Sequence, residues 1–147
     1  MQKFEQLPIM PVESVPEWSN ITVCGNVPTK TKFEAEDLLN MPKARVSGDF
    51  FCNDGWVAKE LLWEGILITK LLSEAGVDPE TLKSVEFKSD DHSRILGVRE
   101  ACEPGVIVAT TLNGRALESG NGGPIRLIAG GRSGDYHVKW LKRIHVS

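Results

Sequence analysis

A single thiol has surroundings that suit a metal ligand. Cys52 lies in the run Phe51-Cys52-Asn53-Asp54-Gly55-Trp56, where Asn, Asp and Gly predict a turn between a preceding strand and a following apolar helix. A thiolate is a soft ligand that can complete the coordination sphere of a metal already bound to sulfur. Most isolated cysteines are instead small buried hydrophobic residues, and composition alone favours that alternative.

Two cationic side chains late in the chain could hold an anion. Arg126 follows the turn-forming run Asn121-Gly122-Gly123-Pro124, and Lys139 lies in the run His137-Val138-Lys139-Trp140. A guanidinium group can donate two parallel charge-assisted hydrogen bonds to a phosphate, and an ammonium group adds a point charge. Because Arg126 alternates with apolar neighbours, the solvent-exposed face of a strand is an alternative, and Lys139 could equally be surface charge.

Together these runs resemble the cofactor signature of the sulfite oxidase family, which includes protein-methionine-sulfoxide reductases. In that family a cysteine ahead of a Trp-x-Gly helix start ligates molybdenum, and Trp63-Glu64-Gly65 follows Cys52 here. An Asn-Gly-x-Pro-x-Arg run and a later Lys-Trp pair bind molybdopterin, whose phosphate suits the two cations. The resemblance implies Cys52 as the metal ligand. It also implies a set of cofactor contacts: Ser89, Asn121, Arg126, His137, Val138 and Lys139.

Some of these residues also have ordinary structural explanations. Ser89 could be a turn residue, and a lone histidine such as His137 is often a structural hydrogen-bonding group. Relatives tend to have Asp-Gly-Tyr just beyond Ser89, whereas this chain has Asp91-His92-Ser93. This departure removes an aromatic hydroxyl expected near the metal, so sulfite is a doubtful substrate. His92 could replace it as a proton donor or be an exposed loop histidine, and no catalytic residue is assigned.

The resemblance implies a molybdopterin-dependent oxidoreductase that transfers an oxygen atom to or from a small oxo-bearing substrate. A separate electron-transfer partner is expected, because no second domain for a haem is apparent. The alternative is a non-catalytic or degenerate binding module with the same fold. A zinc site is disfavoured because Cys-x-x-Cys and His-Glu-x-x-His spacings are absent, and a serine hydrolase because Gly-x-Ser-x-Gly is absent.

Composition limits the partners. The chain has 147 residues, of which 41% are hydrophobic and 25% charged, which is typical of one globular domain. The net charge of -3 disfavours nucleic acid. Five cations nevertheless cluster late in the chain, a local pattern that suits a small anionic ligand better than a duplex. They are Arg126, Arg132, Lys139, Lys142 and Arg143.

The first 18 residues are expected to form an extended arm, because Pro8, Pro11 and Pro16 punctuate them. Residues 19–147 would form the molybdopterin-binding domain. No apolar run approaches the roughly 20 residues needed to span a bilayer, so we expect no membrane span and a cytoplasmic protein, although removal of a leader would also allow export. Three cysteines without close spacing fit a reducing compartment.

The elements that must position these residues indicate an α+β domain of the sulfite oxidase fold, in a compact single-domain version. Apolar residues at helical spacing from Trp63 to Ala75, followed by Gly76, predict a helix. Another short helix is expected over 33–40. Alternating or β-branched runs predict strands over 20–27, 45–52, 82–88, 105–112, 124–129 and 136–146.

Finer features of these strands can also be predicted. Val85 and Phe87 should face the core, because they alternate with polar residues. Asn113-Gly114 should form a hairpin turn. Gly48-Asp49 is expected to bend its strand or place a bulge there.

Overall fold

Two β-sheets dominate the protein. The structure, a computed structural model, describes residues 3–4, 18–51, 57–132 and 136–147. Most of the arm predicted over 1–18, and Cys52 itself, lie outside the described residues. Sheet A contains six strands, in the order β1 (Lys3–Phe4), β5 (Val57–Leu67), β8 (Val106–Leu112) and β10 (Arg126–Ala129), with β4 (Ala44–Phe51) on β5 and β9 (Arg115–Ala116) on β8. Sheet B contains five, in the order β3 (Thr31–Glu34), β2 (Asn20–Gly25), β11 (Arg143–Val146), β6 (Ser84–Lys88) and β7 (Ser93–Gly97).

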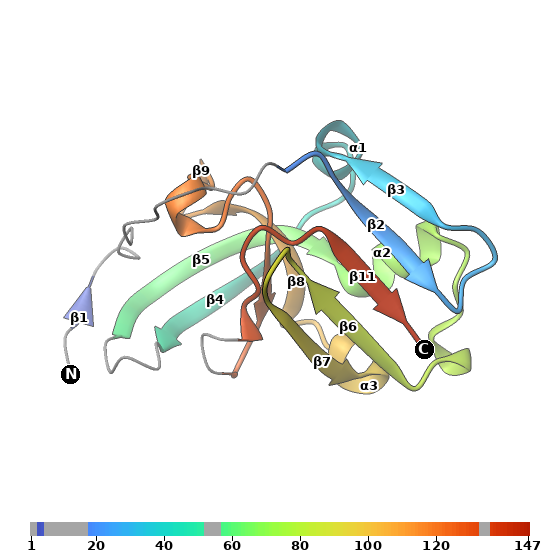
Figure 1. The fold of residues 1–147 in the computed structure, drawn as a ribbon. Coiled ribbons are helices and arrows are strands. Elements are labelled where there is room, and N and C mark those ends of the chain that lie inside the picture. Colours follow the sequence, from blue (N-terminus) through green and yellow to red (C-terminus); the bar gives the residue numbers. More distant parts are fainter. Residues whose placement is uncertain (1–2, 5–17, 52–56, 133–135) are drawn as a thin grey trace.

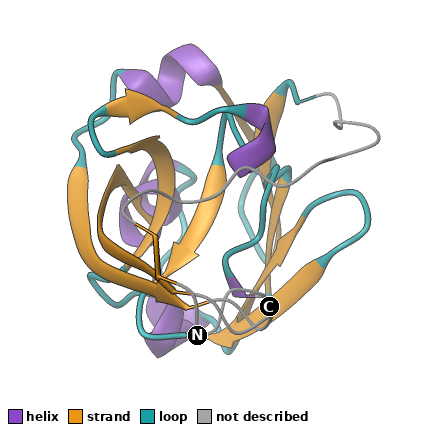
Figure 2. Cartoon of the chain, turned by 90° about the vertical axis from the view of Figure 1, so that its left-hand side faces the viewer, coloured by secondary structure: helices purple, strands orange, loops and turns teal. Residues whose placement is uncertain are grey.

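The helices among the described residues are short and join the strands (Figure 2). They are α1 (Ala35–Leu39), α2 (Ile68–Glu74) and α3 (Val98–Ala101), with 3-10 turns η1 (Pro79–Thr81) and η2 (Ser119–Asn121). Their mixture with two sheets confirms the predicted α+β class. None of the described helices combines the length and apolar character required to cross a membrane.

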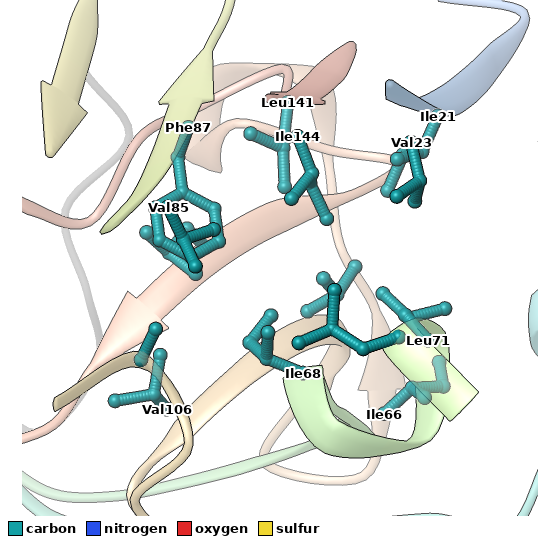
Figure 3. Packing of buried hydrophobic residues seen from close by; sticks show 14 of the residues in the cluster. Ile21, Val23, Ile66, Ile68, Leu71, Val85, Phe87, Val106, Leu141 and Ile144 are labelled. Carbon is teal, nitrogen blue, oxygen red and sulfur yellow. The ribbon is translucent and has the colours of Figure 1, made fainter. Parts of the chain in front are cut away.

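The main core lies between sheet B and the α2 side of sheet A. Figure 3 shows side chains of β2, β6 and β11 meeting side chains of β5, α2 and β8. Val85 and Phe87 are both 0% exposed, which confirms their predicted inward direction. Strand β11 is the centre of sheet B, parallel to β2 and antiparallel to β6, and Figure 1 shows it between them.

The predicted helix beginning at Trp63 is wrong over its first turns, because 63–67 belong to β5. The helix occupies only Ile68–Glu74. Strand β5 passes directly into α2, and its residues face apolar side chains on both sheet faces, so periodicity could not separate strand from helix. Gly65 allows β5 to approach β8 closely, since a Cβ there would collide with the carbonyl oxygen of Val108.

Other boundaries differ by smaller amounts. The first residues of the predicted helix 33–40 belong to β3, and 136–142 are irregular instead of continuing β11. The Asn113-Gly114 turn is confirmed by positive φ angles of 51° and 80°, and it joins β8 to β9. The bulge is confirmed as a register shift between Gly48 and Phe50.

A second, smaller cluster covers the other face of sheet A. It contains Leu61 and Trp63 from β5, Ile107 and Ala109 from β8, Ile128 from β10, and Leu117. Side chains of a strand alternate between faces, so Arg126 and Ile128 share this face while Leu127 and Ala129 point into the main core. The second cluster therefore places a cation beside buried apolar side chains.

Candidate functional site

Arg126 is buried at the start of β10 and joins two loops. Its side chain is 1% exposed. Nη1 donates to the carbonyl oxygen of Asn121 at 3.0 Å and Nη2 donates to that of His137 at 2.7 Å. The guanidinium carbon lies 5.5 Å from the centre of the Trp63 ring, a cation–π distance. One side chain thus fixes the loop before β10 and the segment before β11.

Burial lowers the pKa of Arg126 to about 9, so the guanidinium remains charged at neutral pH. Its hydrogen bonds and the Trp63 ring compensate part of the cost of removing the charge from water. The alternative of a solvent-exposed strand face is wrong, because the second cluster covers this face. Local alternation cannot reveal that cover, which comes from residues distant in sequence.

His137 is held by the backbone on both sides of its ring. Nδ1 accepts a hydrogen bond from the Ala129 N–H at 2.9 Å, and Nε2 lies 3.1 Å from the carbonyl oxygen of Arg132. These partners assign the hydrogen to Nε2 and make the imidazole neutral. The ring is 6% exposed. His137 therefore has a structural role, and its contact with a cofactor stays a prediction.

The loop 119–123 packs directly on Lys139 and Trp140. The Trp140 N–H donates to the Gly122 carbonyl oxygen at 3.1 Å, and its indole N–H donates to that of Ser119 at 3.0 Å. Gly122 has φ of 89°, and a Cβ there would come within 2.8 Å of Lys139 Cβ. Trp140 itself has φ of 51°, which is unusual for a non-glycine residue. The glycine is required for this close approach.

Five of the predicted contact residues thus lie together. The backbones of Arg126 and Lys139 pair in an isolated antiparallel β-bridge. The Leu127 N–H donates to the Val138 carbonyl oxygen at 2.8 Å. Val138 is 1% exposed and belongs to the main core, so a ligand would meet its backbone. The full group is Asn121, Arg126, His137, Val138 and Lys139.

The Asn121 side chain carries a buried acceptor that has no hydrogen-bond partner among the described residues. The side chain is 8% exposed, and the unpartnered atom is its Oδ1. An unsatisfied buried acceptor costs about 1–3 kcal/mol. Such an oxygen could accept a hydrogen bond from an N–H group of a ligand.

Among the described residues, Ser89 forms hydrogen bonds with His92 and none with these five residues. It follows β6, and its hydroxyl donates to the His92 carbonyl oxygen at 3.3 Å, as a turn residue would. It lines a hollow with Lys142 and Asp90, and none of the five residues is among the lining residues. Its predicted contact with the cofactor remains untested, as does that of Cys52, which lies outside the described residues.

A model of the oxidoreductase molybdopterin binding domain matches residues 7–147. The chain belongs to this family. A nitrate reductase [NADPH] of Phytophthora infestans is 37% identical over 93 residues, which cover 58% of this chain and 10% of that protein. The mitochondrial sulfite oxidase of Drosophila melanogaster is 34% identical over 94 residues, which cover 58% of this chain and 16% of that protein. The chain thus spans a minor part of these relatives.

The sulfane dehydrogenase SoxCD from Paracoccus pantotrophus has a similar structure. Its crystal structure superposes with a TM-score of 0.79 and 26% sequence identity, over 87% of this chain and 38% of that one. This similarity and the family match confirm the fold expected from the sequence. They also confirm molybdopterin as the cofactor of the family to which the chain belongs.

The residues of this molybdopterin-binding domain fit such a group. The Asn121 Oδ1 could accept a hydrogen bond from a pterin N–H, and Lys139 could supply a cation for a phosphate. Among the described residues, no cluster of three or more His, Cys, Asp or Glu side chains is arranged around a metal position. A single thiolate ligand, as the sequence predicts for Cys52, would not require one.

Sequence reasoning missed how Trp63 and Trp140 act in this domain. Trp63 was interpreted as part of a helix start, whereas its ring packs on Arg126 from a neighbouring part of sheet A. Trp140 fastens the 119–123 loop through its backbone and indole N–H groups. Neither role has a local signal, because Arg126 and Ser119, the partners of the two rings, lie far from them in the sequence.

Proposed function

We propose that this chain is the molybdopterin-binding part of an oxidoreductase that transfers an oxygen atom to or from a small oxo-bearing substrate. The family match supports the general class. The observation that supports the proposal for this chain is the unpartnered Asn121 Oδ1, in a loop that Arg126 joins to the segment before β11. Asn121 is one of the residues that the sequence resemblance assigns to the pterin.

Each residue of the group has a distinct proposed task. The Asn121 amide oxygen accepts an N–H of the pterin, and the Lys139 ammonium pairs with the phosphate. Arg126 positions the Asn121 and His137 loops, and its buried charge adds to the attraction for the phosphate. His137 fixes the segment before Lys139 through its two backbone contacts. Ser89 is proposed to approach the cofactor from the end of β6.

The metal is proposed to be bound through Cys52, on the sequence resemblance alone. When bound, the molybdenum centre supplies the oxygen-atom transfer, and the protein supplies binding, orientation and electrostatics. Similar proteins include a nitrate reductase, a sulfite oxidase and a sulfane dehydrogenase, which supports a small inorganic or sulfur-containing substrate. Electrons would be exchanged with a separate partner.

The test begins with the purified chain from a host that synthesises molybdopterin. We expect close to one molybdenum atom and one pterin per chain, and turnover of a nitrogen or sulfur oxo compound with a dye as electron donor or acceptor. Cys52→Ser should abolish turnover, whereas Cys24→Ser should not. Asn121→Leu should lower pterin retention, whereas Asn40→Leu, at an exposed helix end, should not.

The outcomes separate the two hypotheses made from the sequence. Failure to retain pterin or molybdenum would overturn the proposal entirely. Full cofactor content without turnover of any tested compound would favour the non-catalytic binding module. Unchanged metal spectra and turnover in Cys52→Ser would refute this residue as the ligand while leaving the cofactor site in place.

A further inference from the structure

The face of sheet B that points away from the core carries cations on neighbouring strands. Residues directly opposite one another in adjacent strands place their side chains on the same face. The register sets Arg143 of β11 opposite Lys88 of β6 and opposite Thr22 of β2, and Thr22 opposite Lys32 of β3. Figure 1 shows this face towards the viewer, with α2 behind the sheet.

The pairing of Arg143 with Lys88 is unfavourable unless an anion lies nearby. Like charges directly opposite on neighbouring strands destabilise a sheet. Within the described part of the chain, neither side chain forms an ion pair. The chain as a whole has a net charge of -3, so this local excess of positive charge is not a consequence of a basic composition.

A hollow of about 410 Å³ opens beside these two cations. Lys142 also lines it, and its ammonium pairs with the Asp90 carboxylate at 2.8 Å. The hollow therefore contains three cations and one carboxylate. The remaining lining residues carry hydroxyl or amide groups: Ser19, Asn20, Thr22 and Ser89. The Thr22 hydroxyl already donates to Asn20 Oδ1 and the Ser89 hydroxyl to the His92 carbonyl oxygen, so the donors left for a ligand are the Ser19 hydroxyl and the Asn20 amide N–H groups.

We infer that this hollow binds a tetrahedral oxyanion of the phosphate type, between Arg143, Lys88 and the neighbouring Ser19 hydroxyl and Asn20 amide. A guanidinium group and an ammonium group on adjacent strands offer the bidentate and point-charge contacts that such an anion requires. The volume exceeds the need of one free ion and falls in the range of roughly 300–1,000 Å³ typical of organic ligands. Either a free phosphate or a phosphate ester could supply the anion.

The lining of this hollow differs from the group proposed to bind molybdopterin. Only Ser89 belongs to both sets, and the lining of the hollow includes none of Asn121, Arg126, His137, Val138 and Lys139. The inference rests on the charge and register of sheet B and does not depend on the proposed function. Failure of one therefore leaves the other intact.

The test is a titration of the isotope-labelled full chain with inorganic phosphate, and in parallel with glycerol phosphate, followed by amide NMR shifts. Ionic strength is kept constant with chloride. We expect saturable shifts at Asn20, Ser89 and Lys142. Arg143→Gln and Lys88→Gln should each weaken binding about tenfold, the equivalent of one charge-assisted hydrogen bond.

Two further variants sharpen the result. Lys32→Gln removes the same charge from the same sheet face but outside the hollow, and should change affinity less than twofold. Asp90→Asn removes the carboxylate that competes for Lys142, and should tighten binding several-fold. Tighter binding of glycerol phosphate would identify an ester as the ligand, and tighter binding of inorganic phosphate a free ion.

Three results would overturn the inference. Shifts that do not saturate, or that spread over surface lysines throughout the chain, would show only a general salt effect. Equal affinity of the parent and Arg143→Gln would remove the proposed contact. Loss of phosphate binding on loading with molybdopterin would make the hollow part of the cofactor site.

Discussion

Arg126 and Arg143 show how two arginines in one small domain acquire opposite roles. Arg126 is buried, with backbone carbonyl groups and an indole ring as partners. Arg143 is on the outer face of sheet B, beside Lys88 and without an ion pair among the described residues. The first is a structural connection between loops, and the second a charge that a ligand could satisfy. The surroundings determine the role, since the side chains are chemically identical.

The strongest way to test this difference is to remove each charge in turn. Arg126→Met should lower the free energy of unfolding by about 3–4 kcal/mol, because two buried carbonyl groups lose their donors at roughly 1–3 kcal/mol each. Arg143→Met should change it by less than about 0.5 kcal/mol. Urea unfolding of both variants measures these values. Similar losses in the two variants would contradict the comparison.

A second variant tests what the indole contributes to the buried arginine. Trp63→Leu should lower the free energy of unfolding by about 2 kcal/mol, because it removes packing and the cation–π contact with Arg126. Trp63→Phe keeps an aromatic face and should lose less. In a double-mutant cycle with Arg126→Met the effects should not add, and full additivity would show that the contact carries no energy.

The unpartnered amide gives a third, smaller effect with an unusual sign. Asn121→Leu should raise the stability of the cofactor-free protein by up to about 1 kcal/mol, since it removes an unsatisfied buried acceptor. The same change should weaken pterin retention, so stability and binding move in opposite directions. Thermal unfolding and pterin analysis of the same preparation measure both. A loss of stability would show that Oδ1 already has a partner.

Arg132 is partly exposed, between the buried Arg126 and the exposed Arg143, and its ion pair gives a pH-dependent contribution to stability. Its hydrogen bond to Glu100, at 2.9 Å, lowers the pKa of that carboxyl from its usual 4.5. The ion pair therefore stabilises the protein above pH 4.5, and its contribution is lost as pH falls through the lowered pKa. The unfolding temperature should differ slightly between the parent and Glu100→Gln at pH 7 and become equal in acid. Glu103→Gln, whose carboxylate lies farther away at 3.5 Å, should give a smaller difference.

The sequence predicted those features that depend on neighbours in the chain. The alternation around Val85 and Phe87, the Asn113-Gly114 turn and the bulge after Gly48 all have local causes. In each of these cases the physical signal is contained in a few consecutive residues. The grouping of Asn121, Arg126, His137, Val138 and Lys139, which the fold brings together, was implied by the family resemblance of the runs that contain them.

The failures have a common non-local cause. Residues 63–67 were assigned to a helix because their apolar side chains fit helical spacing, although both faces of β5 are covered by other parts of the chain. Arg126 likewise packs against the distant Trp63. The sequence groups the late cations together, but sheet pairing buries Arg126 and leaves Arg143 on an exposed face. Lys88, the partner of Arg143, lies too far away in sequence to be included.

The central place of β11 has a consequence for biosynthesis. Strands β2 and β6 leave the ribosome well before Arg143–Val146, which must lie between them. Until then β2 has only β3 as a neighbour and β6 has only β7, so each has an open edge that can pair with another chain. The central strand of sheet B is thus synthesised after the strands on both sides of it. Ribosome stalling or premature termination before Arg143 would yield two unjoined hairpins, which makes the nascent chain prone to aggregation just before β11 is made.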